Sequence, residues 1–357
     1  MPQLVDAERL GEKHFGSGVD SERGAFVISL DFELLWGVRE MAVNGRYRRN
    51  LLGARSAVPR ILTLFSQFEV AATWATVGFL FARDRDQLAD FLPAEQPRYK
   101  HTQFDPYRER IGRNEAEDPL HFGRSLLEII RETPRQEIGS HTFSHYYCLE
   151  KGQNIASFRA DLESAQRIAA ATLGVNLRSL VLPRNQFNPG YATAIREAGF
   201  LCYRGNQRGG IYDAAETLRA TSPVVRAARL ADAYIPVSPD CLQAWHDVLS
   251  DSALCDIRAS RFLRPYNPCS KVLDPLRANR IVSGMRAAAR NGLVYHLWWH
   301  PHNFAAHIAE SLEFLSGILA EFRVLRDQFG FRSMSMAEAA ETAAVLKAPA
   351  TVGSRQP

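Results

Sequence analysis

The chain has 357 residues, of which 46% are hydrophobic and 23% charged, and both fractions are ordinary for a globular protein. A net charge of +4 is small for this length, so it predicts neither a nucleic acid nor a membrane surface as partner. The five cysteines form no C-x-x-C pair, which argues against a zinc ribbon or a thioredoxin-type motif and fits a reducing compartment.

The first 24 residues are polar and charged, without the apolar stretch that a secretory signal contains. The chain also has no continuous run of about 20 apolar residues, the length that a transmembrane helix needs. From these features we expect a cytoplasmic protein without membrane insertion.

Short apolar runs alternate with helical patterns along the chain. Strands are predicted at residues 25–30, 70–76, 137–140, 178–182, 201–203 and 293–299. Helices are predicted at residues 54–68, 155–173, 189–198, 275–289, 305–329 and 335–346. This alternation predicts an α/β protein in which helices cover a parallel sheet.

Two stretches, at about residues 83–124 and 205–275, are irregular and rich in proline and aromatic residues. We interpret them as insertions in a single barrel that spans residues 24–346 and has seven or eight strand–helix units. Residues 1–23 are expected to form an N-terminal tail or capping segment, and residues 347–357 a flexible C-terminal tail.

The segment Ser140-His141-Thr142-Phe143-Ser144-His145 contains two histidines in i, i+4 spacing. Two such imidazoles project the same way from a helical turn or a tight loop, and a carboxylate from elsewhere would complete a three-ligand metal site open to water. A site of this kind activates water and polarises a carbonyl, which indicates hydrolysis. The alternative is a helix N-terminal cap with two partly exposed rings.

The segment Asp31-Phe32-Glu33 places two carboxylates directly after an apolar strand. On a continuing strand they would point to opposite sides, but after a turn of the backbone both can face one pocket. Burial of an acidic pair is costly, and a bound dication would offset that cost. The alternative is exposure of both side chains at the strand end.

Two further polar clusters follow predicted strands, at residues 182–189 and 298–303. His300 is suited to proton transfer near neutral pH. The alternative is that Trp298 and Trp299 fill the core and that the histidines of the following loop have no function. Arg184 could orient a carboxylate or hold an anionic substrate group. Because the C-terminal ends of barrel strands are where ligand sites form, we expect these clusters to meet there.

These segments together resemble the motifs of the polysaccharide deacetylases, the metal-dependent carbohydrate esterases of family four, over about residues 25–345. The D-x-E spacing resembles a branch in which the second acid binds the metal. The resemblance implies a distorted (β/α) barrel with its metal site at the C-terminal ends of the strands. It also implies a hydrolase that removes acetyl groups from sugars.

Carried onto this sequence, the resemblance implies Glu33, His141 and His145 as metal ligands, Asp31 as catalytic base and His300 as proton donor to the leaving group. The reverse assignment of the two acids remains open. The implied ion is zinc, with iron, cobalt or manganese as alternatives.

The third motif departs from the family pattern. Val181 stands where an arginine usually precedes the proline, and Arg184 stands where a tyrosine is usual. Arg184 is therefore expected to be a catalytic residue that either orients Asp31 or contacts substrate. The remaining expected substrate contacts are Asn185, Trp299 and His302.

The expected substrate is an N-acetylated sugar or a sugar-containing precursor such as a sugar nucleotide, in surface polysaccharide biosynthesis. One alternative is hydrolysis of a cyclic amide or imide on the same fold, and another is a non-catalytic carbohydrate-binding relative. A non-haem iron oxygenase would use a similar ligand set, but its typical H-x-[DE] pattern is absent from the ligand segment.

Overall fold

The structure is a computed structural model that describes residues 23–40, 45–208, 212, 223–249 and 254–347. Its strands are β1 (Ala25–Phe32), β2 (Ala72–Thr76), β3 (Gln136–Ser140), β4 (Ser179–Leu180), β5 (Cys202–Tyr203), β6 (Cys255–Asp256), β7 (Arg261–Phe262), β8 (Val294–Trp299) and β9 (Arg332–Met334). The helices that cover them are α1 (Gly45–Gln67), α2 (Arg85–Asp90), α3 (Arg124–Glu132), α4 (Ile155–Leu173), α5 (Ala192–Glu197), α7 (Pro223–Ala231), α8 (Asp274–Asn291), α9 (Ile308–Phe329) and α10 (Met336–Lys347).

The strands form one parallel sheet in the order β6-β5-β4-β3-β2-β1-β8-β7, and β9 pairs with the start of β1. The segment between β6 and β7 joins the two ends of this order. Within it, the Ile257 N–H donates to the Tyr203 carbonyl at 2.9 Å and the Ser260 N–H donates to the His296 carbonyl at 2.8 Å. The sheet therefore curls into a distorted (β/α) barrel, as predicted.

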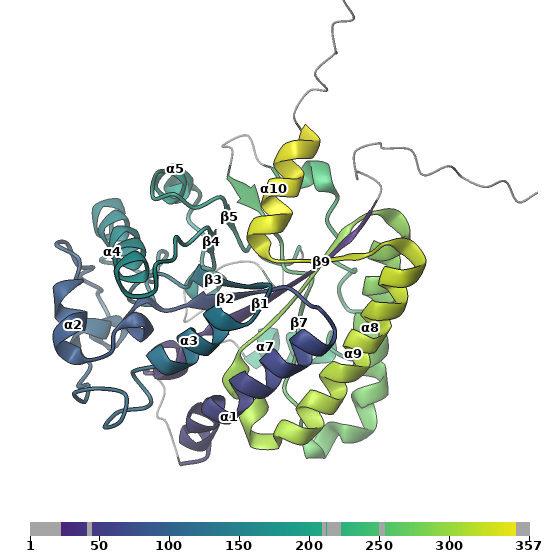
Figure 1. Cartoon of the computed structure of the whole chain (residues 1–357), viewed down its shortest axis with the longest axis horizontal. Coiled ribbons are helices and arrows are strands. Elements are labelled where there is room, and N and C mark those ends of the chain that lie inside the picture. Colours follow the sequence, from purple (N-terminus) through teal and green to yellow (C-terminus); the bar gives the residue numbers. More distant parts are fainter. Residues whose placement is uncertain (1–22, 41–44, 209–211, 213–222, 250–253, 348–357) are drawn as a thin grey trace, which may run out of the picture.

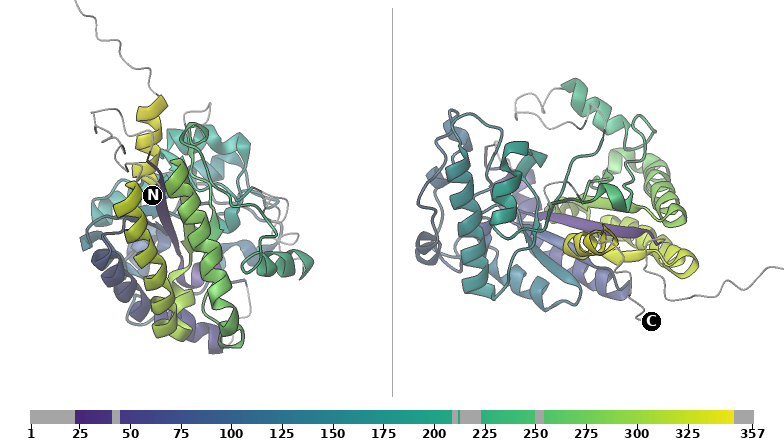
Figure 2. Two further views of the ribbon diagram at one scale, coloured as in Figure 1. Left: turned by 90° about the vertical axis from the view of Figure 1, so that its right-hand side faces the viewer. Right: turned by 90° about the horizontal axis from the view of Figure 1, so that it is seen from above.

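Helices α4, α3, α1, α9 and α8 succeed one another around the outside of the sheet, and α10 lies at the end of the barrel near β5 and β9 (Figure 1). Seen from above, α7 stands away from this ring (Figure 2). Among the residues that the structure describes, no helix combines the length and apolarity that a bilayer span requires.

Strand β1 shows how the barrel acquires one apolar end and one polar end. Its outward residues join the main core beneath the helices: Phe26, Ile28, Leu30 and Phe32. Its inward residues begin with Ala25 and Val27, which pack with α10, and continue with Ser29 and Asp31. The N-terminal end of the barrel is thus filled by apolar side chains, and polar groups gather at the C-terminal end.

The helix predicted at residues 155–173 is confirmed. It is followed by Gly174, which has a φ of +66° and so adopts the left-handed conformation that glycine favours. Helix α1 begins at Gly45, earlier than predicted, and continues through Pro59. The description of residues 205–275 as irregular was partly wrong, because α7, β6 and β7 lie there; two-residue strands give no periodic signal. The predicted tails fall almost wholly outside the described residues.

The packing predicts a sharp contrast between two phenylalanines. Phe65 is fully buried and meets the Trp74 and Trp299 rings edge-on at centroid distances of 6.4 and 6.2 Å, whereas Phe329 is 38% exposed. We expect Phe65→Ala to lower the free energy of unfolding by about 3–5 kcal/mol in urea titrations. The same substitution at Phe329 should cost less than half as much. Equal losses would contradict this description of the core.

Candidate metal centre

Three buried side chains from two distant segments converge at the C-terminal end of the barrel. The Nε2 atoms of His141 and His145 each lie 3.3 Å from the same Glu33 carboxylate oxygen, Oε2. Ligand atoms at about 2.0–2.1 Å from a tetrahedral zinc ion are roughly 3.3–3.4 Å apart. The spacing and the donor set of two imidazoles and one carboxylate therefore fit a divalent cation.

Glu33 reaches this point because the backbone turns sharply where β1 ends. Phe32 is the last strand residue, Glu33 has left the strand conformation at φ −129° and ψ −16°, and Leu34 has a φ of +46°. The carboxylate then lies directly over Gly37, where an added Cβ would sit 1.9 Å from its carbon. The turn brings Glu33 to the same pocket as Asp31, as the sequence predicts.

The two histidines project from a tight loop that follows β3. The loop is held by two left-handed residues, Thr142 and His145, with φ of +62° and +58°. Asp161 of α4 braces it by accepting hydrogen bonds from the Phe143 N–H at 2.7 Å, the Ser144 N–H at 3.1 Å and the Ser144 hydroxyl. Both imidazoles are at most 2% exposed, so the alternative of a helix cap with exposed rings was wrong.

Hydrogen bonds at the far side of each ring fix the tautomers. The His141 Nδ1–H donates to the Val181 carbonyl at 2.9 Å. Nδ1 of His145 lies 3.1 Å from the Tyr147 hydroxyl, which itself donates to Glu40 and so accepts from the ring. Each Nε2 lone pair therefore faces Glu33, as metal ligation requires. Burial lowers the pKa of His145 to about 4, which keeps this ring neutral.

Asp31 is held by an arginine that sequence reasoning missed. Arg204, directly after β5, donates to the two Asp31 carboxylate oxygens at 2.6 and 2.8 Å, and it stacks 4.1 Å from the Trp298 ring centroid. Burial would raise the pKa of Asp31, but the Arg204 charge and hydrogen bonds outweigh it, so the pKa is lowered. The position of Arg204 one residue past a predicted strand was a usable signal.

A neutral histidine supports Arg204 from the barrel interior. Arg204 Nη1 donates to the Ser29 hydroxyl at 3.0 Å, and His296 Nε2 lies 2.8 Å from the same hydroxyl. The other ring nitrogen, Nδ1, donates to the Ile257 carbonyl at 3.2 Å, so Nε2 accepts from Ser29. Burial, followed by the nearby Arg204 charge, lowers the pKa of His296 to about 3.

His300 stands at the open side of the site, immediately after β8. Its Nε2 lies 3.4 Å from Glu33 Oε1 and 3.8 Å from Asp31 Oδ2, and its side chain is 24% exposed. The parallel registers of β1 with β2 and of β1 with β8 set these strand ends level with one another. His300 is thus the group of this cluster that an incoming molecule can reach most easily.

Arg184 does not contact Asp31, so it does not orient this carboxylate as one of the two expectations had it. It forms an ion pair with Glu40 at 3.1 Å and lies over the Tyr147 ring, 5.0 Å from its centroid. Arg184 therefore supports the group that contacts His145, while Arg204 orients Asp31. Arg184 also lines the pocket, so it can still contact substrate.

The expected substrate contacts divide into two groups. Asn185 and His302 line the pocket, and the His302 ring lies 3.1 Å from the Tyr47 hydroxyl. Trp299 does not line it: its side chain is fully buried and stacks on Phe304. The structure corrects this expectation, since residues alternate along β8 and the neighbouring Trp298 faces the pocket instead.

Comparison with known proteins agrees with this geometry. Residues 52–203 match the sequence model of a family described as polysaccharide deacetylase. The predicted relationship to the polysaccharide deacetylases is confirmed. The matched range contains both site histidines, whereas Asp31, Glu33 and His300 lie outside it. No curated protein matches the chain in sequence.

Two solved structures share the fold of this protein along nearly the whole chain. A Mycobacterium smegmatis protein provisionally assigned as a polysaccharide deacetylase aligns with a TM-score of 0.58 and 15% identity, covering 93% of this chain and 94% of its own. The Puue allantoinase aligns with a TM-score of 0.51 and 12% identity, covering 96% and 99%. At these identities the likeness concerns the fold.

The contact between Glu33 and Gly37 predicts a specific loss of metal. In Gly37→Ala the new methyl group would displace the Glu33 carboxylate, and we expect zinc affinity to fall by about 10–100-fold in chelator competition. Gly317→Ala is the matched control, because nothing lies within 4 Å of that added Cβ. The control should keep its metal and gain roughly 0.5–1 kcal/mol of stability. Unchanged affinity in Gly37→Ala would contradict the ligand role of Glu33.

The neutral His296 predicts acid sensitivity of folding. The unfolded chain takes up a proton at this residue below about pH 6.5, whereas the folded protein does so only near pH 3. The free energy of unfolding contributed by His296 is therefore lost as pH falls through this window, by about 1.4 kcal/mol per pH unit. The free energy of unfolding of metal-free protein is measured by urea titration at several pH values between 6 and 5. Its decrease per pH unit should be smaller by that amount in His296→Gln.

His246→Gln supplies the control for this measurement, because the His246 side chain is 83% exposed. Its pH slope should match that of the unsubstituted protein. A His296→Gln variant with the unsubstituted slope would show that this histidine is protonated in the folded state.

Proposed function

We propose that the protein is a metal-dependent deacetylase that hydrolyses the acetamide of an N-acetylated sugar. The observation that carries the proposal is the convergence of Glu33, His141 and His145 beside a carboxylate, Asp31, that Arg204 holds ionised. A divalent cation bound by the three ligands, zinc by its donor preferences, would polarise the amide carbonyl and acidify a water molecule.

The remaining steps belong to the side chains around the ligands. The ionised Asp31 carboxylate is placed to accept a proton from the attacking water, while its hydrogen bonds to Arg204 keep it from rotating away. His300, partly exposed and 3.8 Å from Asp31, would donate a proton from Nε2 to the departing sugar amine. Acetate and the free amino sugar are then released. Trp298, on the pocket wall, offers an apolar face for the sugar ring.

Removal of the proposed base tests this assignment. We expect Asp31→Asn to lower kcat for acetate release about 10²–10⁴-fold with metal content retained, because Asn keeps a hydrogen-bond acceptor for Arg204 but cannot take a proton. Asp90→Asn, at an exposed carboxylate of α2, should leave kcat unchanged. Full turnover in Asp31→Asn would remove this carboxylate from the mechanism.

The same assay separates the two other candidate functions. Each purified protein is incubated with a panel of N-acetylated sugars and, separately, with cyclic amides and imides, and acetate and ring-opened acid are both measured. Ring opening that depends on Asp31, without acetate release, would assign a cyclic amidase. Binding of sugars with no turnover of any compound would assign a non-catalytic relative.

A further inference from the structure

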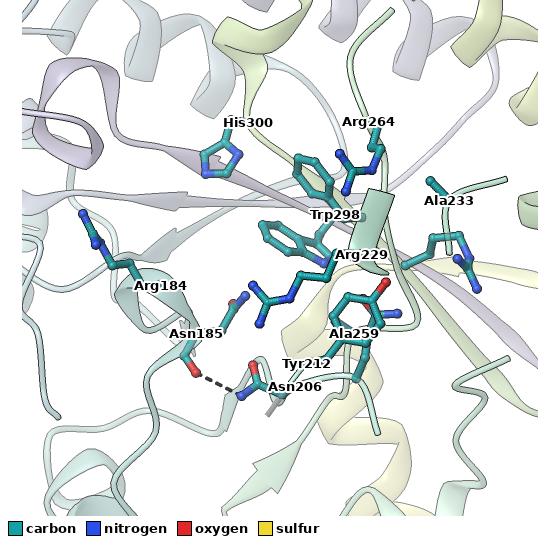
Figure 3. A pocket seen from close by; sticks show the side chains of 13 residues that line it. Arg184, Asn185, Asn206, Tyr212, Arg229, Ala233, Ala259, Arg264, Trp298 and His300 are labelled. Carbon is teal, nitrogen blue, oxygen red and sulfur yellow. Dashed lines mark hydrogen bonds between the residues drawn. The ribbon is translucent and has the colours of Figure 1, made fainter. Parts of the chain in front are cut away.

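A second pocket opens beside the metal centre and is continuous with it. His300, Trp298, Arg184 and Asn185 line both spaces, as does Phe262. Figure 3 shows Arg184 and Asn185 on one side of this second pocket and Arg264 on the other, with Trp298 and His300 between them. A molecule that reacts at the metal centre can therefore extend along Trp298 into this space.

The second pocket is strongly basic. Its lining includes four arginines, Arg184, Arg229, Arg261 and Arg264, and among its described lining residues there is no Asp or Glu. Three of these arginines interact with other groups of the protein, and Arg229 lies over the Tyr212 ring, 5.7 Å from its centroid. Arg184 pairs with Glu40 at 3.1 Å, and Arg261 pairs with the fully buried Asp232 at 3.3 Å.

Arg264 is not balanced in this way. Within the part of the chain that the structure describes, its guanidinium makes no hydrogen bond or ion pair, although it is partly buried. Burial lowers the pKa of Arg264, and the like charge of Arg229 acts in the same direction, whereas Tyr212, Tyr234 and Asp232 oppose this shift. A partly buried guanidinium without a hydrogen-bond partner is costly, and an oxyanion bound to Arg264 would offset that cost.

We propose that Arg264 and Arg229 form a subsite for an oxyanion, a phosphate or a carboxylate, on the sugar substrate. The inference rests on the proposed deacetylase function and adds the substrate class: an acidic rather than a neutral N-acetylated sugar. Arginine matches both oxyanions, since its planar fork donates two parallel hydrogen bonds to a pair of oxygens.

The neighbouring side chains fit this arrangement. Trp298 and Phe262 provide apolar surface between the metal centre and the arginines. Asn206 donates to the Asn185 carbonyl at 3.1 Å, which fixes the polar side of the pocket opposite Arg264 (Figure 3). The proposed substrate would place its acetamide at the metal centre, its sugar ring along Trp298 and its anionic group at the arginines.

Calorimetry with defined sugars tests the subsite. Binding of N-acetylglucosamine 1-phosphate, the corresponding N-acetylated uronic acid and neutral N-acetylglucosamine is measured on the metal-loaded protein and on Arg264→Gln and Arg229→Gln. We expect at least one anionic sugar to bind tenfold or more tightly than the neutral one, and each variant to lose about tenfold for that sugar alone. Arg264→Lys should recover part of the loss. Arg60→Gln, at an exposed arginine of α1, should change nothing.

The anionic sugar that binds more tightly identifies phosphate or carboxylate as the group recognised. Equal binding of the neutral and both anionic sugars, or equal losses in Arg264→Gln and Arg60→Gln, would overturn the subsite. Acetate release is followed on the same sugars. Release from the neutral sugar at the same kcat/KM would overturn the subsite and leave the deacetylase proposal intact. Selective, arginine-dependent binding without any acetate release would support the subsite and overturn the deacetylase.

Discussion

Two carboxylates from one strand end, Asp31 and Glu33, are both buried at the C-terminal end of the barrel, and the cost of that burial determines what surrounds them. An ionised carboxylate without compensation is too costly in such a place, so each one needs a group or an ion that offsets its charge. Asp31 has the bidentate Arg204. Glu33 has the two imidazoles and the space between them that a dication fits.

This division explains how two acids two residues apart can do different work. The Asp31 oxygens accept hydrogen bonds from the Arg204 guanidinium, which keeps this carboxylate ionised and oriented. The Glu33 carboxylate lies over Gly37 and faces two imidazoles whose far nitrogens already donate to Val181 and Tyr147. In the proposed mechanism, a metal ligand and a base thus come from one turn of the chain.

The arginines near the site differ in whether they form an ion pair within the protein. Arg204 and Arg184 neutralise Asp31 and Glu40, and both pairs hold the metal centre in shape. Arg264 has no such partner among the described residues and lies where a substrate would extend beyond the metal. An arginine that is paired within the protein therefore stabilises the site, whereas an arginine without such a partner can bind an anionic group of a substrate.

The sequence alone determined the α/β class with a parallel sheet, through the alternation of apolar runs and helical periods. The polar motifs after strand ends and their resemblance to a family indicated the barrel and the candidate ligands. The sequence could not determine Arg204 as the partner of Asp31 or Trp298 as the pocket wall in place of Trp299. Those depend on which face of a short strand turns inward and on which strands are neighbours in the closed sheet. Strands β5 to β7 have only two residues each, so they carry no periodic signal, and only the tertiary structure set their register.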